Sequence, residues 1–136
     1  MIELINYIKK SHVCHKEEPL NVVDIIKTQK ELVRMECPFL PADFIEFLTT
    51  FNGIRASDCA ILGISPLQDK ALDIVEFNNQ FNDSPDTAIL GYDDSVFLIY
   101  DNTENNYKLI DKNNMMVVEE FLNDELVFAL NSILHF

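Results

Sequence analysis

Acidic side chains gather around the turns of the second half of the chain, and their grouping invites a chemical interpretation. Asp93 and Asp94 are adjacent, and Asp101, Glu104 and Asp111 follow. Grouped carboxylates can hold a divalent cation or share a proton as general acid and base. Each of these residues, however, borders an apolar run, where aspartate commonly forms turns. We therefore interpret these carboxylates as turn-forming residues. A carboxylate-based metal enzyme is the third-ranked hypothesis, after the two kinds of binding protein described below.

Motifs that build a catalytic centre around a nucleophile or a phosphate are absent from the sequence. It contains no G-x-S-x-G, no phosphate-binding loop pattern and no H-E-x-x-H, and its 3 glycines are too few for phosphate-cradling loops. His135 lies next to the last residue, and chain ends are poor places for a rigidly held general base. We expect a protein without catalytic residues or cofactors.

Histidine and cysteine residues near the start of the chain raise the question of a metal site. His12, Cys14 and His15 lie close together, but no C-x-x-C or H-x-x-x-H pair completes a four-coordinate site. Together with Cys37 and Cys59 the chain has 3 cysteines, an odd number without paired spacing. This pattern argues against a disulfide framework and for a reducing compartment. We expect no bound metal.

The charge balance is strongly negative: 23 Asp and Glu residues against 10 Lys and Arg residues give a formal net charge of -13. Such a surface repels nucleic acids and anionic lipids and attracts basic proteins. No apolar run is long enough to span a membrane, and the opening MIELINYIKK lacks the features of a signal peptide. We expect a cytoplasmic protein that binds neither nucleic acid nor membrane. The charge either suits a basic partner or only maintains solubility.

A protein-binding surface requires less of the sequence than an active site does. Such surfaces commonly combine a few charged pairs with aromatic anchors. For the tyrosines, packing at strand edges with the hydroxyl in water is the alternative interpretation. The predicted partner-binding residues are Tyr92, Asp93, Asp94, Tyr100, Asp101, Glu104 and Tyr107.

The stretch LPADFIEFLTTFNG has the clearest helical pattern among the elements that must position these side chains. Pro41 suits a first helical turn, and Gly53 after Asn52 suits a left-handed helix end. We therefore predict a core helix over residues 41–52. Its apolar stripe, at helical spacing, consists of Leu40, Phe44, Phe47, Leu48 and Phe51.

A second helix is predicted over residues 22–35. Asn21 is a suitable N-cap, Cys37-Pro38 ends the helix, and Lys27 can pair with Glu31 on the outer side. The stripe expected to face the core consists of Val22, Ile25, Ile26, Leu32 and Val33.

Other helical segments have shorter patterns. Residues 69–81 and 124–134 carry apolar side chains at helical spacing, and Asn123 is a suitable N-cap for the second of them. Residues 2–9 have a partial helical pattern, and residues 10–19 form a polar connector.

Strands are expected mainly in the second half of the chain. A short apolar run closed by Ser65-Pro66 predicts the first, and turn-forming clusters separate the others. Connections this short require antiparallel neighbours, so we predict a single α+β domain over residues 1–136, whose exposed strand edges leave a homodimer open. The predicted strands cover residues 59–64, 87–92, 96–101, 107–111 and 115–121.

The order of these segments resembles the SUKH superfamily, the bacterial immunity proteins related to a fungal cell-wall assembly regulator. The resemblance covers residues 22–134, and after Gly91 this chain has Asp94-Ser95-Val96 where many relatives are glycine-rich. The motifs that carry it are Leu40-Pro41, Asp43-Phe44, Phe47-Leu48, Asn52-Gly53, Leu62-Gly63 and Gly91 with Asp93-Asp94.

The resemblance implies a noncatalytic protein that binds and neutralises a toxin domain, often a nuclease, delivered by a neighbouring cell. The partner expected from the charge is a basic toxin domain. An intracellular regulatory or scaffold module of the same fold, binding endogenous proteins, is the alternative. Fold alone does not decide between the two.

Overall fold

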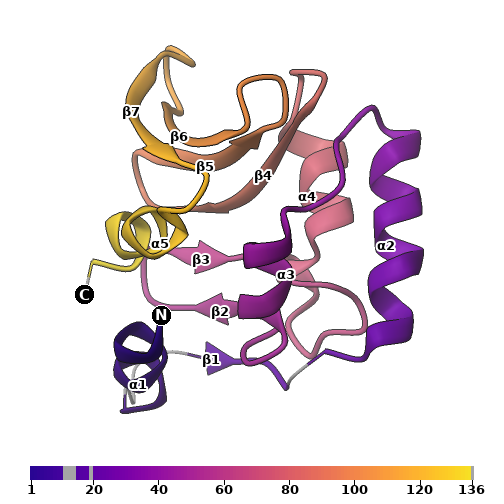
Figure 1. Ribbon diagram of the computed structural model, residues 1–136, viewed down its shortest axis with the longest axis vertical. Coiled ribbons are helices and arrows are strands. Elements are labelled where there is room, and N and C mark those ends of the chain that lie inside the picture. Colours follow the sequence, from indigo (N-terminus) through magenta and orange to yellow (C-terminus); the bar gives the residue numbers. More distant parts are fainter. Residues whose placement is uncertain (11–14, 19, 136) are drawn as a thin grey trace.

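Helices and one antiparallel sheet make up the computed structural model, which confirms the predicted α+β class (Figure 1). The structure describes residues 1–10, 15–18 and 20–135. In chain order the elements are α1 (Ile2–Lys10), β1 (His15–Lys16), α2 (Val22–Arg34), α3 (Ala42–Leu48), β2 (Ile54–Arg55), β3 (Ala60–Ile61), the 3-10 helix η1 (Lys70–Leu72), α4 (Ile74–Phe81), β4 (Thr87–Tyr92), β5 (Val96–Asp101), β6 (Asn106–Asp111), β7 (Val117–Leu122) and α5 (Leu126–Leu134).

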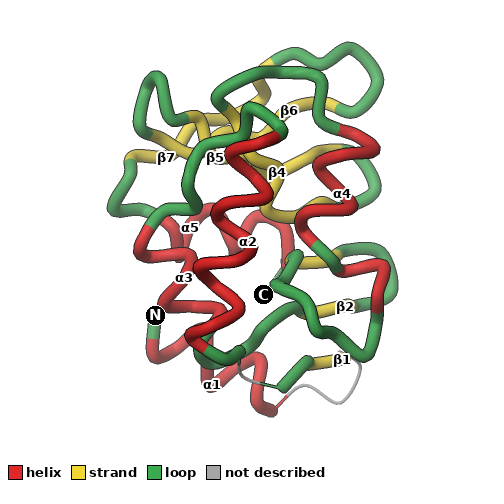
Figure 2. The backbone as a smooth tube through the Cα atoms, turned by 90° about the vertical axis from the view of Figure 1, so that its right-hand side faces the viewer, coloured by secondary structure: helices red, strands yellow, loops and turns green. Residues whose placement is uncertain are grey.

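The sheet has seven strands that lie in the order of the sequence, from β1 at one edge to β7 at the other. Every adjacent pair is antiparallel. Helix α5 lies against β3, β6 and β7, so the sheet curves around it (Figure 1). Helix α4 packs along β4, and α2 lies beside α4 as an outer layer, with its length in full view in Figure 2.

The stripe predicted for the helix after Leu40 is buried as expected. Leu40, Phe44, Phe47, Leu48 and Phe51 are each at most 7% exposed. The helix is shorter than predicted, because α3 ends at Leu48 and a turn follows it. The rings of Phe47 and Phe51 nevertheless remain in contact, with centroids 6.2 Å apart.

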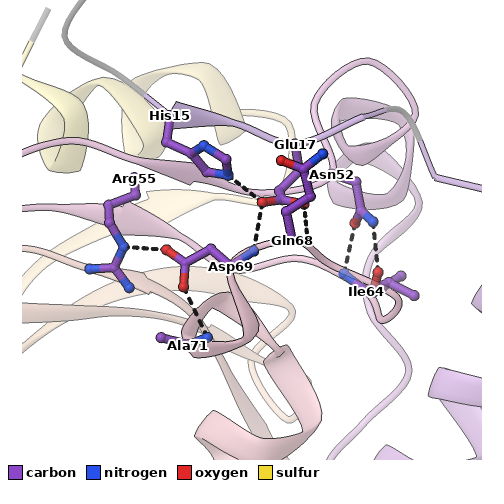
Figure 3. A network of polar contacts seen from close by, with 8 residues as sticks. All are labelled: His15, Glu17, Asn52, Arg55, Ile64, Gln68, Asp69 and Ala71. Atoms are coloured by element: carbon purple, nitrogen blue, oxygen red, sulfur yellow. Dashed lines mark hydrogen bonds and ion pairs between the residues drawn. The ribbon is translucent and has the colours of Figure 1, made fainter.

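Gly53 does not end this helix, contrary to the prediction. It has the positive φ that was expected, 113°, but it lies directly before β2, where its carbonyl accepts the N–H of Glu17 at 3.1 Å. The buried amide of Asn52 accepts the N–H of Ile64 at 2.7 Å and donates to the Ile64 carbonyl at 2.6 Å (Figure 3). The Asn-Gly pair therefore joins α3 to the sheet.

Asn78, on the buried side of α4, holds the helix to β4. Its amide accepts the N–H of Ile89 at 2.7 Å and donates to the Ile89 carbonyl at 3.0 Å.

The register between β4 and β5 shifts between Ile89 and Gly91. A Cβ atom at Gly91 would lie 2.6 Å from the carbonyl oxygen of Ala60, so glycine allows β3 and β4 to approach each other here.

The predicted helix over residues 69–81 is in fact two helices, η1 and α4. Asp73 lies between them in an extended conformation. Its carboxylate accepts the N–H groups of Val75 at 2.9 Å and Glu76 at 3.4 Å. This is N-cap geometry, so a new helix starts where the apolar spacing predicted a continuous one.

The boundaries of several strands differ from the prediction. Of residues 59–64 only Ala60–Ile61 form a strand, although the N–H of Leu62 still donates to the Leu90 carbonyl at 2.8 Å. Strands β1 and β2 were not predicted, since two residues are too few to show a period of two. The strand predicted over 115–121 starts at Val117.

Helix α5 starts later than predicted and without a cap from Asn123. Its N-cap residue is Glu125, whose side chain does not cap the helix. The Glu125 carboxylate instead accepts the N–H of Leu122 at 2.7 Å, at the end of β7. The partial helical pattern of residues 2–9 is confirmed by α1.

Helix α2 begins and ends close to the prediction. The Asn21 side chain accepts the N–H of Val23 at 3.1 Å, which confirms the N-cap, and the helix ends at Arg34. The pair expected between Lys27 and Glu31 does not form within the described part of the chain.

The buried side of α2 differs from the predicted one. Thr28 and Leu32 are buried, whereas Val22, Ile26 and Val33 are 68%, 59% and 49% exposed. Apolar residues occupy two sides of this helix, and only one of them can face the core. The predicted stripe is therefore wrong for three of its members.

Within the described ranges, no helix has the length and apolar character needed to cross a lipid bilayer.

Replacing Phe47 by alanine tests the assignment of α3 as a core helix. Phe47 is 1% exposed, so Phe47→Ala should leave a cavity and lower the free energy of unfolding by about 3–5 kcal/mol. Phe39→Ala is the matched control, because Phe39 is 64% exposed and its truncation should lower the free energy of unfolding only slightly. Denaturant unfolding of both variants checks this; equal losses would contradict it.

Candidate protein-interaction surface

The structure does not bring the seven predicted partner-binding residues together. Tyr92 ends β4 and is followed by Asp93 and Asp94, whereas Asp101 ends β5 and Glu104 follows it. Strand β5 has 6 residues and thus a length of about 20 Å, so these two groups lie at opposite ends of the β4–β5 hairpin. They form two local clusters.

Tyr100 and Tyr107, the other two predicted residues, belong to the core. They face each other across β5 and β6 with ring centroids 5.7 Å apart, and they are 6% and 0% exposed. Burial raises the pKa of both hydroxyls, and nearby Asp43 raises that of Tyr107 further. The Tyr100 hydroxyl donates to Asn105 at 2.8 Å. Neither ring is available as an anchor for a partner.

The cluster after β4 is half-buried and internally paired. The ring of Tyr92 stacks on Phe77, with centroids 5.1 Å apart, and the Lys112 ammonium lies 4.8 Å from the Tyr92 centroid. One oxygen of Asp93 accepts the N–H groups of Ser95 and Val96, as in a turn, and the other lies 3.1 Å from His135. Of the three predicted residues here, only Asp94 is exposed.

The cluster after β5 surrounds one buried cation, Lys108, and we call it the Lys108 cluster. The Lys108 ammonium lies 2.9 Å from Asp101, 3.0 Å from Glu104 and 3.7 Å from Glu120. Burial raises the pKa of Asp101, but the hydrogen bond from Lys108 and those from two backbone N–H groups lower it overall. The hydrogen bond to Asp101 raises the pKa of Lys108. Three carboxylates thus share one ammonium, and negative charge is in excess.

Strand β7, next to the Lys108 cluster, is the most exposed strand of the sheet. It pairs with β6 on one side, and no described strand pairs with its other side. Glu119 and Glu120 lie at its centre, both exposed. We call this region the β7 edge surface; its apolar side chains, each at least 50% exposed, are Met115, Met116, Val117, Val118 and Leu122.

A polar network that the sequence did not reveal lies at the opposite edge of the sheet (Figure 3). Its centre is Glu17, which is 6% exposed. The Glu17 carboxylate accepts the backbone N–H groups of Gln68 at 2.6 Å and Asp69 at 3.0 Å, and it also contacts His15. Burial alone would raise the pKa of Glu17, but these hydrogen bonds lower it below the ordinary value of 4.5.

Asp69 extends this network to β2. Its carboxylate accepts the Nε–H of Arg55 at 2.6 Å and the N–H of Ala71 at 3.1 Å. The hydrogen bond from Arg55 is the main reason that the pKa of Asp69 is lowered. The network, which we call the Glu17 clamp, fastens β1 and β2 to the loop before η1.

A hollow of about 470 Å³ lies beside the clamp, lined among others by Glu17, Asp24, Asn52 and Gln68. Both oxygens of Glu17 already accept hydrogen bonds, and the Asn52 amide is bound to Ile64. These two buried side chains therefore support the structure and do not offer free groups to a ligand.

Among residues 1–10, 15–18 and 20–135, no three metal-ligating side chains lie close enough together to hold a metal ion. His12 and Cys14 of the cluster considered in the sequence lie outside the described residues. Cys37 and Cys59 are buried, and burial raises the pKa of the Cys37 thiol.

Two features of the structure, the exposed apolar residues around β7 and the Glu17 clamp, have no clear signal in the sequence. The exposed apolar residues around β7 follow each other as Met115-Met116-Val117-Val118, a run without alternation that indicates no buried face. The partners of Glu17 are 51 and 52 residues away in sequence, so no local pattern marks them.

The comparison with models of known protein families finds no match, and no curated protein matches the sequence. The resemblance to the SUKH superfamily therefore stays a prediction from the order of its motifs.

Acid unfolding tests the Glu17 clamp. The folded pKa values of Glu17 and Asp69 lie below the ordinary 4.5 and 3.8, so their stabilisation is complete above those values and is lost as the pH falls through the folded pKa values. We expect the free energy of unfolding to decrease below about pH 4.5 and Glu17→Gln to weaken that decrease. At pH 7 the same variant should lose about 1–3 kcal/mol, since an amide cannot accept all these donors.

Glu18→Gln is the matched control for this prediction, because the neighbouring Glu18 is exposed. Its unfolding free energy should follow that of the parent at every pH. Identical acid profiles for Glu17→Gln and the parent would show that the clamp does not contribute to stability.

Proposed function

We propose that the protein is a noncatalytic binding protein of the immunity type, which neutralises a toxin domain by binding it. The order of motifs over residues 22–134 supports the family, and the formal net charge of -13 supports a basic partner. A nuclease is a suitable toxin class, because its cleft must be basic to hold phosphate.

The observation that carries this proposal is the excess of carboxylates beside exposed apolar side chains at the β7 edge surface. Glu104 and Glu120 both contact Lys108, so the Lys108 cluster and β7 form one continuous region. Apolar side chains there can supply affinity, while the carboxylates accelerate association with a basic surface. Of the predicted residues, Glu104 and Asp101 belong to this region.

The open edge of β7 also suits a partner that contributes backbone hydrogen bonds. An unpaired edge strand presents N–H and carbonyl groups that an extended segment can pair with. Pairing with a second copy is disfavoured by charge: antiparallel strands centred on Glu119 and Glu120 would place glutamates opposite each other. A basic segment of another protein would meet no such repulsion.

Co-expression tests the proposed function directly. The protein should restore growth to cells that produce the toxin encoded beside its own gene, and the purified pair should form a complex that high salt weakens. Failure of both experiments with every adjacent toxin would overturn the proposal. A complex with an endogenous protein, without protection, would favour the regulatory or scaffold alternative.

Charge reversal on β7 locates the surface. Glu119→Lys with Glu120→Lys should slow association with the toxin about tenfold or more at low salt, because electrostatic steering is lost. The control is Asp58→Lys with Glu76→Lys, which changes the net charge equally at exposed residues outside β7. Stopped-flow binding measures both; equal rates for the two double variants would place the interface elsewhere.

A further inference from the structure

The outer side of α2 carries an apolar stripe that no described part of the chain covers. Val22, Ile26 and Val33 project from this side at helical spacing, and these residues are 68%, 59% and 49% exposed. Val23, next to them, is 72% exposed. Large apolar side chains gathered on one exposed helix face are typical of protein contacts.

Phe39 widens this apolar area. Gln29 lies on α2 between Ile26 and Val33, and its amide accepts the N–H of Leu40 at 2.8 Å and donates to the Leu40 carbonyl at 3.5 Å. These two hydrogen bonds hold the chain at Leu40 alongside the stripe. Phe39 directly precedes Leu40 and is 64% exposed.

Three cations border the stripe on its other side. Lys27, Lys30 and Arg34 are exposed, and within the described residues they form no ion pair. By contrast, Arg55 and Lys108 are both paired with carboxylates.

The two acidic residues of α2, Asp24 and Glu31, lie on the side of the helix opposite the stripe. In a chain with a net charge of -13, the side of α2 beside the stripe is thus locally basic.

We propose that this face of α2 binds an acidic amphipathic helix of a second protein. The stripe from Val22 to Val33 is straight and about 16 Å long, three helical turns, which suits packing against another helix. Apolar side chains of the partner would cover the stripe, and its carboxylates would pair with Lys27, Lys30 and Arg34.

Charge complementarity distinguishes this partner from the other possible occupants. Two copies packed through α2 would bring their cations together, and an anionic membrane would repel the remainder of this acidic chain. The partner proposed for β7 is basic, so the two surfaces select different proteins. The inference about α2 does not rest on the proposed function, and either can fail without the other.

A synthetic peptide tests the proposal with the full chain. The probe is a fluorescent amphipathic helix of about 14 residues, with leucines on one face and glutamates beside them. Fluorescence anisotropy should show saturable binding that salt weakens, and Ile26→Glu or the pair Lys30→Glu and Arg34→Glu should reduce the affinity about tenfold or more. A probe with lysine in place of glutamate should not use the α2 face, so Ile26→Glu should leave any binding of that probe to the acidic β7 edge surface unchanged.

Phe128→Glu on α5 is the matched control, because Phe128 is 61% exposed and lies outside both α2 and the β7 edge surface. It should bind the acidic probe as the parent does, and all variants should keep the parent melting temperature. Equal affinity of the α2 variants and the parent, or no binding of the probe, would overturn the proposal. So would vesicle binding or self-association that Ile26→Glu abolishes.

Discussion

Buried backbone groups at the ends of short strands need partners, and this fold depends on polar side chains to supply them. Because β2 and β3 have two residues each, they pair few of the N–H and carbonyl groups around them. Asn52 binds both backbone groups of Ile64, and Asn78 does the same for Ile89. Glu17 accepts two N–H groups of the loop before η1. Together these three side chains join helices, loop and sheet where the ladder is too short.

Charge is distributed unevenly over the molecule, and the two proposed surfaces follow from that distribution. Lys108 is enclosed by three carboxylates near β7, so it reduces but does not cancel their charge. The cations of α2 form no ion pair among the described residues. A protein whose overall charge is -13 can therefore present one face that attracts basic proteins and another that attracts acidic ones.

The spacing of the apolar residues and the positions of the turn-forming residues predicted most of the fold, and the wrong predictions have identifiable physical causes. The stripe around Phe47 was predicted because its apolar side chains all lie on one face of the helix, so only that face could be the buried one. Helix α2 has apolar residues on two sides, and only its packing in the folded chain decides that Leu32 is buried and Ile26 is exposed. For the site, the positions of the carboxylates at turns were predicted. The burial of Tyr107 depends on pairing between β5 and β6 and on α3, which residue types alone do not reveal.

The sequential order of the strands has a consequence for how the molecule folds and opens. Strands β4 to β7 are joined by short turns, so their pairing closes small loops and costs little chain entropy. The contacts of Glu17 join residues 51 and 52 positions apart and close a much larger loop. The strands that carry the β7 edge surface therefore form a locally closed unit that does not need β1. In a hydrogen-exchange experiment, the backbone amides of β1 should therefore exchange sooner than those of β5 and β6.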